Sequence, residues 1–139
     1  MLKNVLLAVL SAAMLFAVVA PTQAAAKRDD LRLRARMSGA TLMSGKADYR
    51  ERTRDNTLEQ RFSVEVEDAT PGETLEVRVN GALFGTITAD DFGVAELQFR
   101  TAQFIDDPGD GTPIPTDFPR LAAGDTVTVG PISGAFAAR

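Results

Sequence analysis

The sequence predicts an all-β fold, an antiparallel β-sandwich of 7-8 short strands, and two observations lead to this fold class. Apolar and polar residues alternate with a period of two through most of the chain after residue 30. Clusters of Gly, Pro, Asn and Asp separate these segments at hairpin spacing, and none of the segments has convincing helical periodicity. A small closed β-barrel is the alternative, and it is favoured if the first and last strands pair with each other.

The first three expected strands alternate most clearly. The segment 31–38 (LRLRARMS) places an arginine at every second position, and 46–53 (KADYRERT) follows a turn region over 39–45. After a polar turn over 54–57, the segment 58–68 has apolar residues on one face and charged or polar residues on the other. Each of these segments therefore predicts a strand with one buried and one solvated face.

The middle of the chain is typical of a β-meander. The turn Thr70-Pro71-Gly72-Glu73 precedes a strand expected over 75–80. Asn80-Gly81 is the dipeptide favoured in two-residue hairpins, because both central positions need positive φ. Strands over 82–88 and 94–101 follow, and alternation resumes over 125–129 and 132–136.

A long loop rich in Pro and Asp interrupts this rhythm over residues 102–124. Loops of this length in compact domains are uncommon and are usually functional or disordered. Its acidic part, residues 106–112, places carboxylates among glycines, and calcium prefers carboxylate and carbonyl oxygens as ligands. Asp106, Asp107 and Asp110 are therefore candidate calcium ligands, with a solvated acidic turn as the alternative; no other cofactor is expected.

The N-terminal segment predicts export. Lys3 precedes an uncharged, mostly apolar run over 5–20, and Pro21 and small residues follow. This order is typical of a signal peptide over 1–24, with cleavage after Ala24 or Ala26. An uncleaved anchor is the alternative, although a span needs about 20 apolar residues. We therefore expect a secreted or periplasmic protein, with one β domain over 25–139 and no integral membrane span after processing.

The composition excludes several kinds of catalysis. The 139 residues include no His, no Cys and no Trp, so a Ser-His-Asp triad, a thiolate nucleophile, a Cys-ligated zinc site and a disulfide framework cannot form. A pair of carboxylates could still hydrolyse glycans, but the single Tyr and the absence of Trp leave few rings to stack on a sugar. We therefore expect a protein that is not an enzyme.

Five arginines form a candidate polyanion-binding site. If the first two strands pair, their outer faces carry a basic stripe that suits sulfated or phosphorylated polymers: Arg32, Arg34, Arg36, Arg50 and Arg52. The alternative is ordinary cross-strand ion pairing with Glu65, Glu67 and Glu76. Nucleic acid is not an expected partner, because the whole chain has a formal charge of −4 and few aromatic residues.

Strand and turn segments across most of the expected mature chain form a shared pattern: GKADYR over 45–50, FSVEVE over 62–67, VRVNG over 77–81, FGTI over 84–87 and GDTV over 124–127. The pattern resembles small exported bacterial all-β proteins of unknown function, and it implies export and an all-β domain without catalytic residues. We expect a non-catalytic binding or structural module of the cell envelope or exterior, whose partner is an anionic polymer or another envelope protein. The alternatives are a small barrel that carries an apolar ligand and a carboxylate-based glycan hydrolase.

Overall fold

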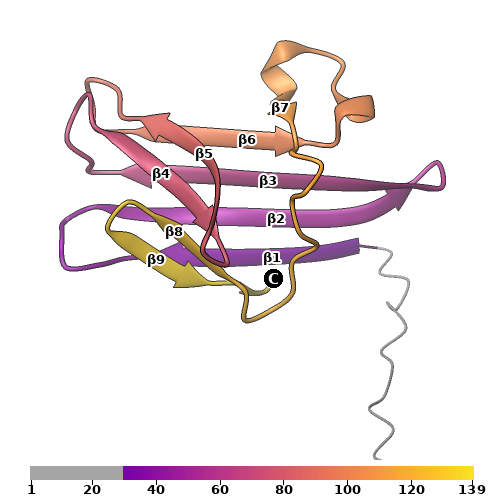
Figure 1. The fold of residues 1–139 in the computed structure, drawn as a ribbon, viewed down its shortest axis with the longest axis horizontal. Helices are drawn as coiled ribbons and strands as arrows, with labels where there is room; N and C mark the ends of the chain where they lie inside the picture. Colours follow the sequence, from indigo (N-terminus) through magenta and orange to yellow (C-terminus); the bar gives the residue numbers. More distant parts are fainter. Residues whose placement is uncertain (1–29) are drawn as a thin grey trace, which may run out of the picture.

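The computed structural model describes residues 30–139, which form two β-sheets packed face to face (Figure 1). The six-stranded sheet has the order β10-β1-β2-β3-β6-β7, and the four-stranded sheet has the order β5-β4-β8-β9. The strands are β1(Asp30–Met37), β2(Ser44–Arg54), β3(Thr57–Glu67), β4(Thr74–Val79), β5(Ala82–Thr88), β6(Ala95–Arg100), β7(Thr112–Pro113), β8(Thr126–Val129), β9(Ile132–Ala135) and β10(Ala137–Ala138). Two short 3-10 helices are η1(Ala102–Phe104) and η2(Pro108–Asp110).

The predicted all-β sandwich is confirmed, and the closed barrel is wrong. The first and last strands do pair, but only over two residues of β10. The barrel does not close, because the six-stranded sheet ends at β7 on its other side and the four-stranded sheet keeps its own edges, β5 and β9. The barrel that an apolar-ligand carrier would require is therefore not formed.

The predicted signal peptide, with its cleavage after Ala24 or Ala26, lies outside the described residues. Among residues 30–139, no helix has the length and apolar character needed to cross a membrane.

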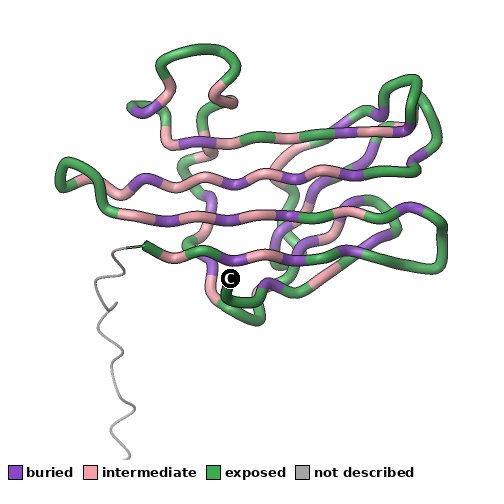
Figure 2. Tube along the Cα trace, turned by 180° about the vertical axis from the view of Figure 1, so that it is seen from behind, coloured by how far each residue is buried: buried purple, intermediate pink, exposed green. Residues whose placement is uncertain are grey.

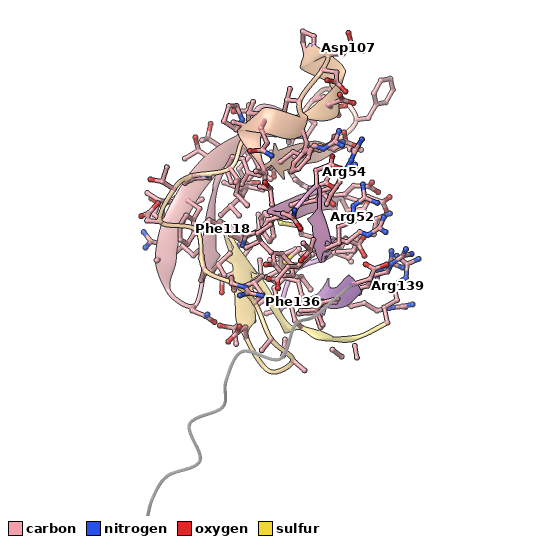
Figure 3. The ribbon with its side chains drawn as sticks, turned by 90° about the vertical axis from the view of Figure 1, so that its right-hand side faces the viewer. Arg52, Arg54, Asp107, Phe118, Phe136 and Arg139 are labelled. Atoms are coloured by element: carbon pink, nitrogen blue, oxygen red, sulfur yellow. The ribbon has the colours of Figure 1, made fainter. Side chains whose placement is uncertain are left out.

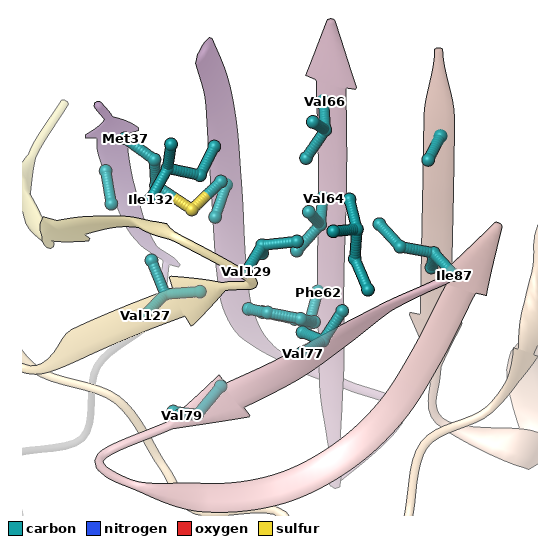
Figure 4. Packing of buried hydrophobic residues seen from close by; sticks show 14 of the residues in the cluster. Met37, Phe62, Val64, Val66, Val77, Val79, Ile87, Val127, Val129 and Ile132 are labelled. Atoms are coloured by element: carbon teal, nitrogen blue, oxygen red, sulfur yellow. The ribbon is translucent and has the colours of Figure 1, made fainter. Parts of the chain in front are cut away.

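Period-two alternation places the core between the two sheets. Along the long strands of the six-stranded sheet, buried positions alternate with half-buried and exposed ones (Figure 2). The largest fully buried side chains include Tyr49, Phe62, Phe136 and Ile132. Figure 4 shows apolar side chains from both sheets meeting in this layer, with Phe62 between Val77 and Val64. Each such side chain contributes about 1.5–3 kcal/mol when it is fully buried.

The Asn80-Gly81 turn confirms the predicted hairpin between β4 and β5. Asn80 has a φ of 49° and Gly81 a φ of 82°, as a turn of this kind requires. The Asn80 side-chain oxygen also accepts a hydrogen bond from the Thr126 backbone N–H at 2.9 Å. The turn is thereby attached to the start of β8, its neighbour in the sheet.

The long loop covers the part of the core that the four-stranded sheet leaves open. After β7 the chain crosses β6, β3, β2 and β1 beside the four-stranded sheet (Figure 1). Phe118 from this loop packs with ring centroids 5.0 Å from Phe62 of the larger sheet and 4.8 Å from Phe84 of the smaller one. Leu121 is fully buried nearby. The loop is therefore a structural element that closes one end of the sandwich.

Candidate functional site

A row of four arginines crosses the outer face of the six-stranded sheet. The strand register places Arg32 of β1 opposite Arg50 of β2, Arg50 opposite Arg61 of β3, and Arg61 opposite Arg100 of β6. Because neighbouring strands lie about 4.8 Å apart, the four Cα positions span about 14 Å. Like charges directly opposite each other destabilise a sheet, so this row needs counter-charges.

Asp30 provides the first counter-charge, at the β1 end of the row. Its carboxylate accepts hydrogen bonds from Arg50 at 3.0 and 3.1 Å and from Arg32 at 3.2 and 3.3 Å. These hydrogen bonds, from Arg50 first and then Arg32, lower the pKa of Asp30. One carboxylate is thus shared between two guanidinium groups.

Asp48 on β2 is likewise shared between two arginines. Arg34 of β1 donates to its two carboxylate oxygens at 2.8 and 3.0 Å, and Arg139 donates to Oδ1 at 3.4 Å. The Arg34 side-chain hydrogen bonds to Asp48 raise the pKa of Arg34. Fork-like contacts of this kind fix the plane of a guanidinium group as well as its position.

Glu59 is the third carboxylate of the site and contacts more arginines than the other two. It lies on the outer face of β3, as the alternation predicts, but it is only 1% exposed. Its carboxylate accepts hydrogen bonds from Arg52 at 2.6 Å and from Arg61 and Arg100 at 3.0 Å. Burial by itself would raise the pKa of Glu59, but the three arginine hydrogen bonds outweigh it and lower the pKa to about 2.

Together these contacts define the arginine patch, in which seven arginines share three carboxylates: Arg32, Arg34, Arg50, Arg52, Arg61, Arg100 and Arg139 around Asp30, Asp48 and Glu59. Guanidinium groups are therefore in excess, even though Arg100 also lies 3.5 Å from Asp110. Figure 3, which looks along the strands, shows nitrogen atoms gathered on the outer side of this sheet, where Arg52, Arg54 and Arg139 are labelled.

The patch contains four of the five arginines that the sequence singled out. Arg36 is the exception, because it lies toward the opposite end of the face and stands opposite Lys46. The expected acidic partners are largely different as well. Glu65 pairs with Lys46 at 3.2 Å, and Glu76 lies on the other sheet, where it pairs with Arg78.

Sequence reasoning missed three members of the patch, Arg61, Arg100 and Arg139. The sequence does place Arg61 and Arg100 at outward positions of the strands expected over 58–68 and 94–101, and this was the available signal. Their place in the row depends on β3 and β6 being neighbours in one particular register. Arg139 follows β10 and is held there by its backbone N–H, which donates to the Arg32 carbonyl at 3.0 Å.

The acidic loop is held by hydrogen bonds between its own residues. An Asp110 carboxylate oxygen accepts hydrogen bonds from the backbone N–H groups of Asp106 at 3.2 Å and Asp107 at 3.3 Å. These hydrogen bonds, from Asp107 first and then Asp106, lower the pKa of Asp110. In the part of the chain that the structure describes, no three acidic side chains are grouped so that they could hold a metal ion. The candidate calcium ligands therefore gain no geometric support, and of the two interpretations we expect the solvated acidic turn.

A second buried carboxylate, Glu51, lies on the inner face of β2 and is fully buried. It accepts a hydrogen bond from the Tyr49 hydroxyl at 2.8 Å and is ion-paired with Arg120 of the long loop. Burial, followed by the contacts with Glu51, raises the pKa of Tyr49 despite a hydrogen bond from Gln60. Glu51 and Glu59 are on opposite faces of the sheet, so they do not form the facing pair that glycoside hydrolysis needs.

No protein-family model and no curated protein matches the chain. The resemblance to small exported β proteins therefore stays a prediction, and we infer the function from the fold and the arginine patch.

Proposed function

We propose that the protein is an exported, non-catalytic module that binds anionic polymers through the arginine patch. The observation that carries this proposal is the four-arginine row, in which guanidinium groups outnumber the carboxylates that hold them. Guanidinium groups bind phosphate, sulfate and carboxylate groups through paired hydrogen bonds. A row about 14 Å long offers several such contacts to one linear polymer.

Within the patch, burial separates the positioning groups from the groups available to a ligand. Arg100 has a side chain only 10% exposed and Glu59 none of it, so these two residues hold their neighbours in place. Arg32, Arg61 and Arg139 have side chains that are 53%, 42% and 57% exposed. These three present guanidinium groups to solvent in fixed positions, which lowers the entropy lost when a ligand binds.

The distribution of charge over the chain also supports a directed polyanion site. Residues 27–61 hold ten basic and six acidic residues, whereas 62–139 hold four and thirteen. Five of the seven arginines of the patch come from the first segment, so much of the excess positive charge of that segment lies at the site, where it attracts a polyanion.

The proposal that the protein is exported rests on the N-terminal segment. The intact mass of the secreted protein should then correspond to a chain that begins at Ala25 or Lys27. A mass that retains Met1 would contradict cleavage of the signal peptide.

Retention on a sulfated resin tests the binding function. We expect the purified protein to bind at low salt and to elute as salt rises, because the contacts are electrostatic and screened within about 10 Å at 0.1 M. The double variant Arg32→Gln/Arg61→Gln should elute at clearly lower salt. The matched control is Arg36→Gln/Arg78→Gln, which removes the same charge from positions outside the patch.

Two results would overturn the proposal. One is a protein that passes through the resin even at low salt. The other is a control double variant that loses as much retention as the patch variant, because binding would then reflect total charge and not this site.

A further inference from the structure

A hollow of about 290 Å³ lies at the β10 edge of the arginine patch, over β1 and β2. Arg32, Asp48, Arg50 and Arg139 line it, and the backbone at Leu33 and Tyr49 forms its floor because those two side chains point into the core. Ligand pockets in proteins have volumes from about 300 Å³ upward, so this hollow has room for one small ligand unit.

The lining combines three positive charges with one acceptor. Arg32 and Arg50 approach from the row, and Arg139 approaches from beyond β10. Arg139 and Arg34 donate to Asp48 Oδ1, and Arg34 also donates to Oδ2. A carboxylate has about four acceptor positions, so these three hydrogen bonds leave room on Oδ2 for one more donor.

We propose that this hollow, the anchor subsite, binds a sugar unit that carries a phosphate or sulfate group. The anionic group contacts Arg139 and the N–H groups of Arg32 and Arg50 that Asp30 does not already engage. A sugar hydroxyl donates to Asp48. The inference rests on the proposed function and narrows the polymer to a phosphorylated or sulfated polysaccharide.

Asp48 is the reason for choosing a sugar over a simpler polyanion. A chain of bare phosphates would place its own negative charge against the Asp48 carboxylate, which is unfavourable. A sugar ester brings hydroxyl groups next to its anionic group, so both parts of the mixed lining are satisfied. Sites that hydrogen-bond a hydroxyl discriminate against ligands that lack one.

The test compares small probes of matched charge by NMR titration of the purified protein at low salt. One pair is inorganic phosphate and glucose 6-phosphate at pH 8, where both are mainly dianions, and the other is methyl sulfate and glucose 6-sulfate, which are both monoanions. We expect each sugar ester to bind about fivefold more tightly than its sugar-free counterpart, as one added hydrogen bond allows. The pair with the larger ratio of affinities indicates whether the natural polymer carries phosphate or sulfate groups. The backbone signals of Arg139 and its neighbours should show the largest shifts.

Two variants locate the effect. Asp48→Asn should strengthen the binding of inorganic phosphate and reduce the preference for the sugar ester. Asp55→Asn is its matched control, because Asp55 is an exposed hairpin residue paired with Arg54 at 3.7 Å, and the preference should stay unchanged. Arg139→Gln should weaken the binding of both esters, whereas Arg78→Gln on the other sheet should not.

The outcomes separate this inference from the proposed function. If the protein binds the sulfated resin but prefers neither sugar ester to its sugar-free counterpart, the arginine patch stands and the anchor subsite is wrong. The subsite is also wrong if the shifts centre on Arg61 and Arg100. If neither the resin nor any probe binds, both proposals fail.

Discussion

Replacing Glu59 by Gln tests whether charge holds the arginine patch together. The variant keeps the size of the side chain but removes the negative charge from a group that is 1% exposed and accepts hydrogen bonds from three arginines. Arg100, with its side chain only 10% exposed, would then lack its main counter-charge. Removing one partner of a buried ion pair is strongly destabilising, because the other charge stays buried.

The pKa of Glu59 sets the expected size of the effect. The folded chain holds it at about 2, and an unfolded chain has glutamate near 4.3. At about 1.4 kcal/mol per pKa unit, this difference corresponds to about 3 kcal/mol of stability at neutral pH. Water reaches Arg52 and Arg61 and screens part of this interaction, so we expect a loss of about 2 kcal/mol. For a domain of this size, the melting midpoint should fall by about 8 °C.

The pH dependence distinguishes charge from packing. The folded-state pKa of Glu59 lies below its unfolded value, so its stabilising contribution is complete above the unfolded pKa and is lost as the pH falls toward 2. The Gln variant cannot titrate at this position. The difference in unfolding free energy between the two proteins should therefore shrink as the pH falls from about 5 to about 2.

Urea unfolding followed by far-UV circular dichroism is the assay, since the chain has no Trp for fluorescence. Glu65→Gln is the matched control, because Glu65 is more exposed and pairs with Lys46 alone at 3.2 Å. Its loss should stay within about 0.5 kcal/mol. A Glu59→Gln protein as stable as the parent at pH 7 would refute the reasoning. A stability difference that does not change with pH would assign the effect to packing instead.

Two further predictions concern the long loop over 102–124. Arg120→Ala should destabilise the protein by about 1–2 kcal/mol, because it breaks an ion pair with the fully buried Glu51 while the Arg120 side chain is itself 47% exposed. Protease cleavage within the loop should become faster; unchanged cleavage would show that Phe118 packing alone secures the loop. Excess calcium, compared with EDTA, should leave the melting midpoint unchanged, because an Asp110 oxygen already accepts two backbone N–H groups. A bound ion at a hundredfold excess over Kd would add about 2.7 kcal/mol, so a rise of several degrees would contradict this.

Local patterns in the sequence were enough to predict the longer strands and their faces, but not the two-residue strands β7 and β10. Alternation over 31–38 and 58–68 identified β1 and β3, because the side chains of a strand point to opposite faces regardless of what packs against them. Asn80-Gly81 identified a hairpin for an equally local reason, the positive φ that its two residues tolerate. The long loop was recognised from its composition, but the order of the strands that it crosses was not predicted.

The tertiary structure alone decided which charges meet. Arg100 and Glu59 are 41 positions apart in the sequence, and Arg120 and Glu51 are 69 apart. Their pairing depends on strand order and register, which follow from how the apolar faces of distant segments pack together. A period of two tells which way Glu59 points, but its burial arises from three arginines on three different strands. The sequence by itself determined the sandwich and its basic strands, and only the packing of distant strands brought those arginines together as a candidate site.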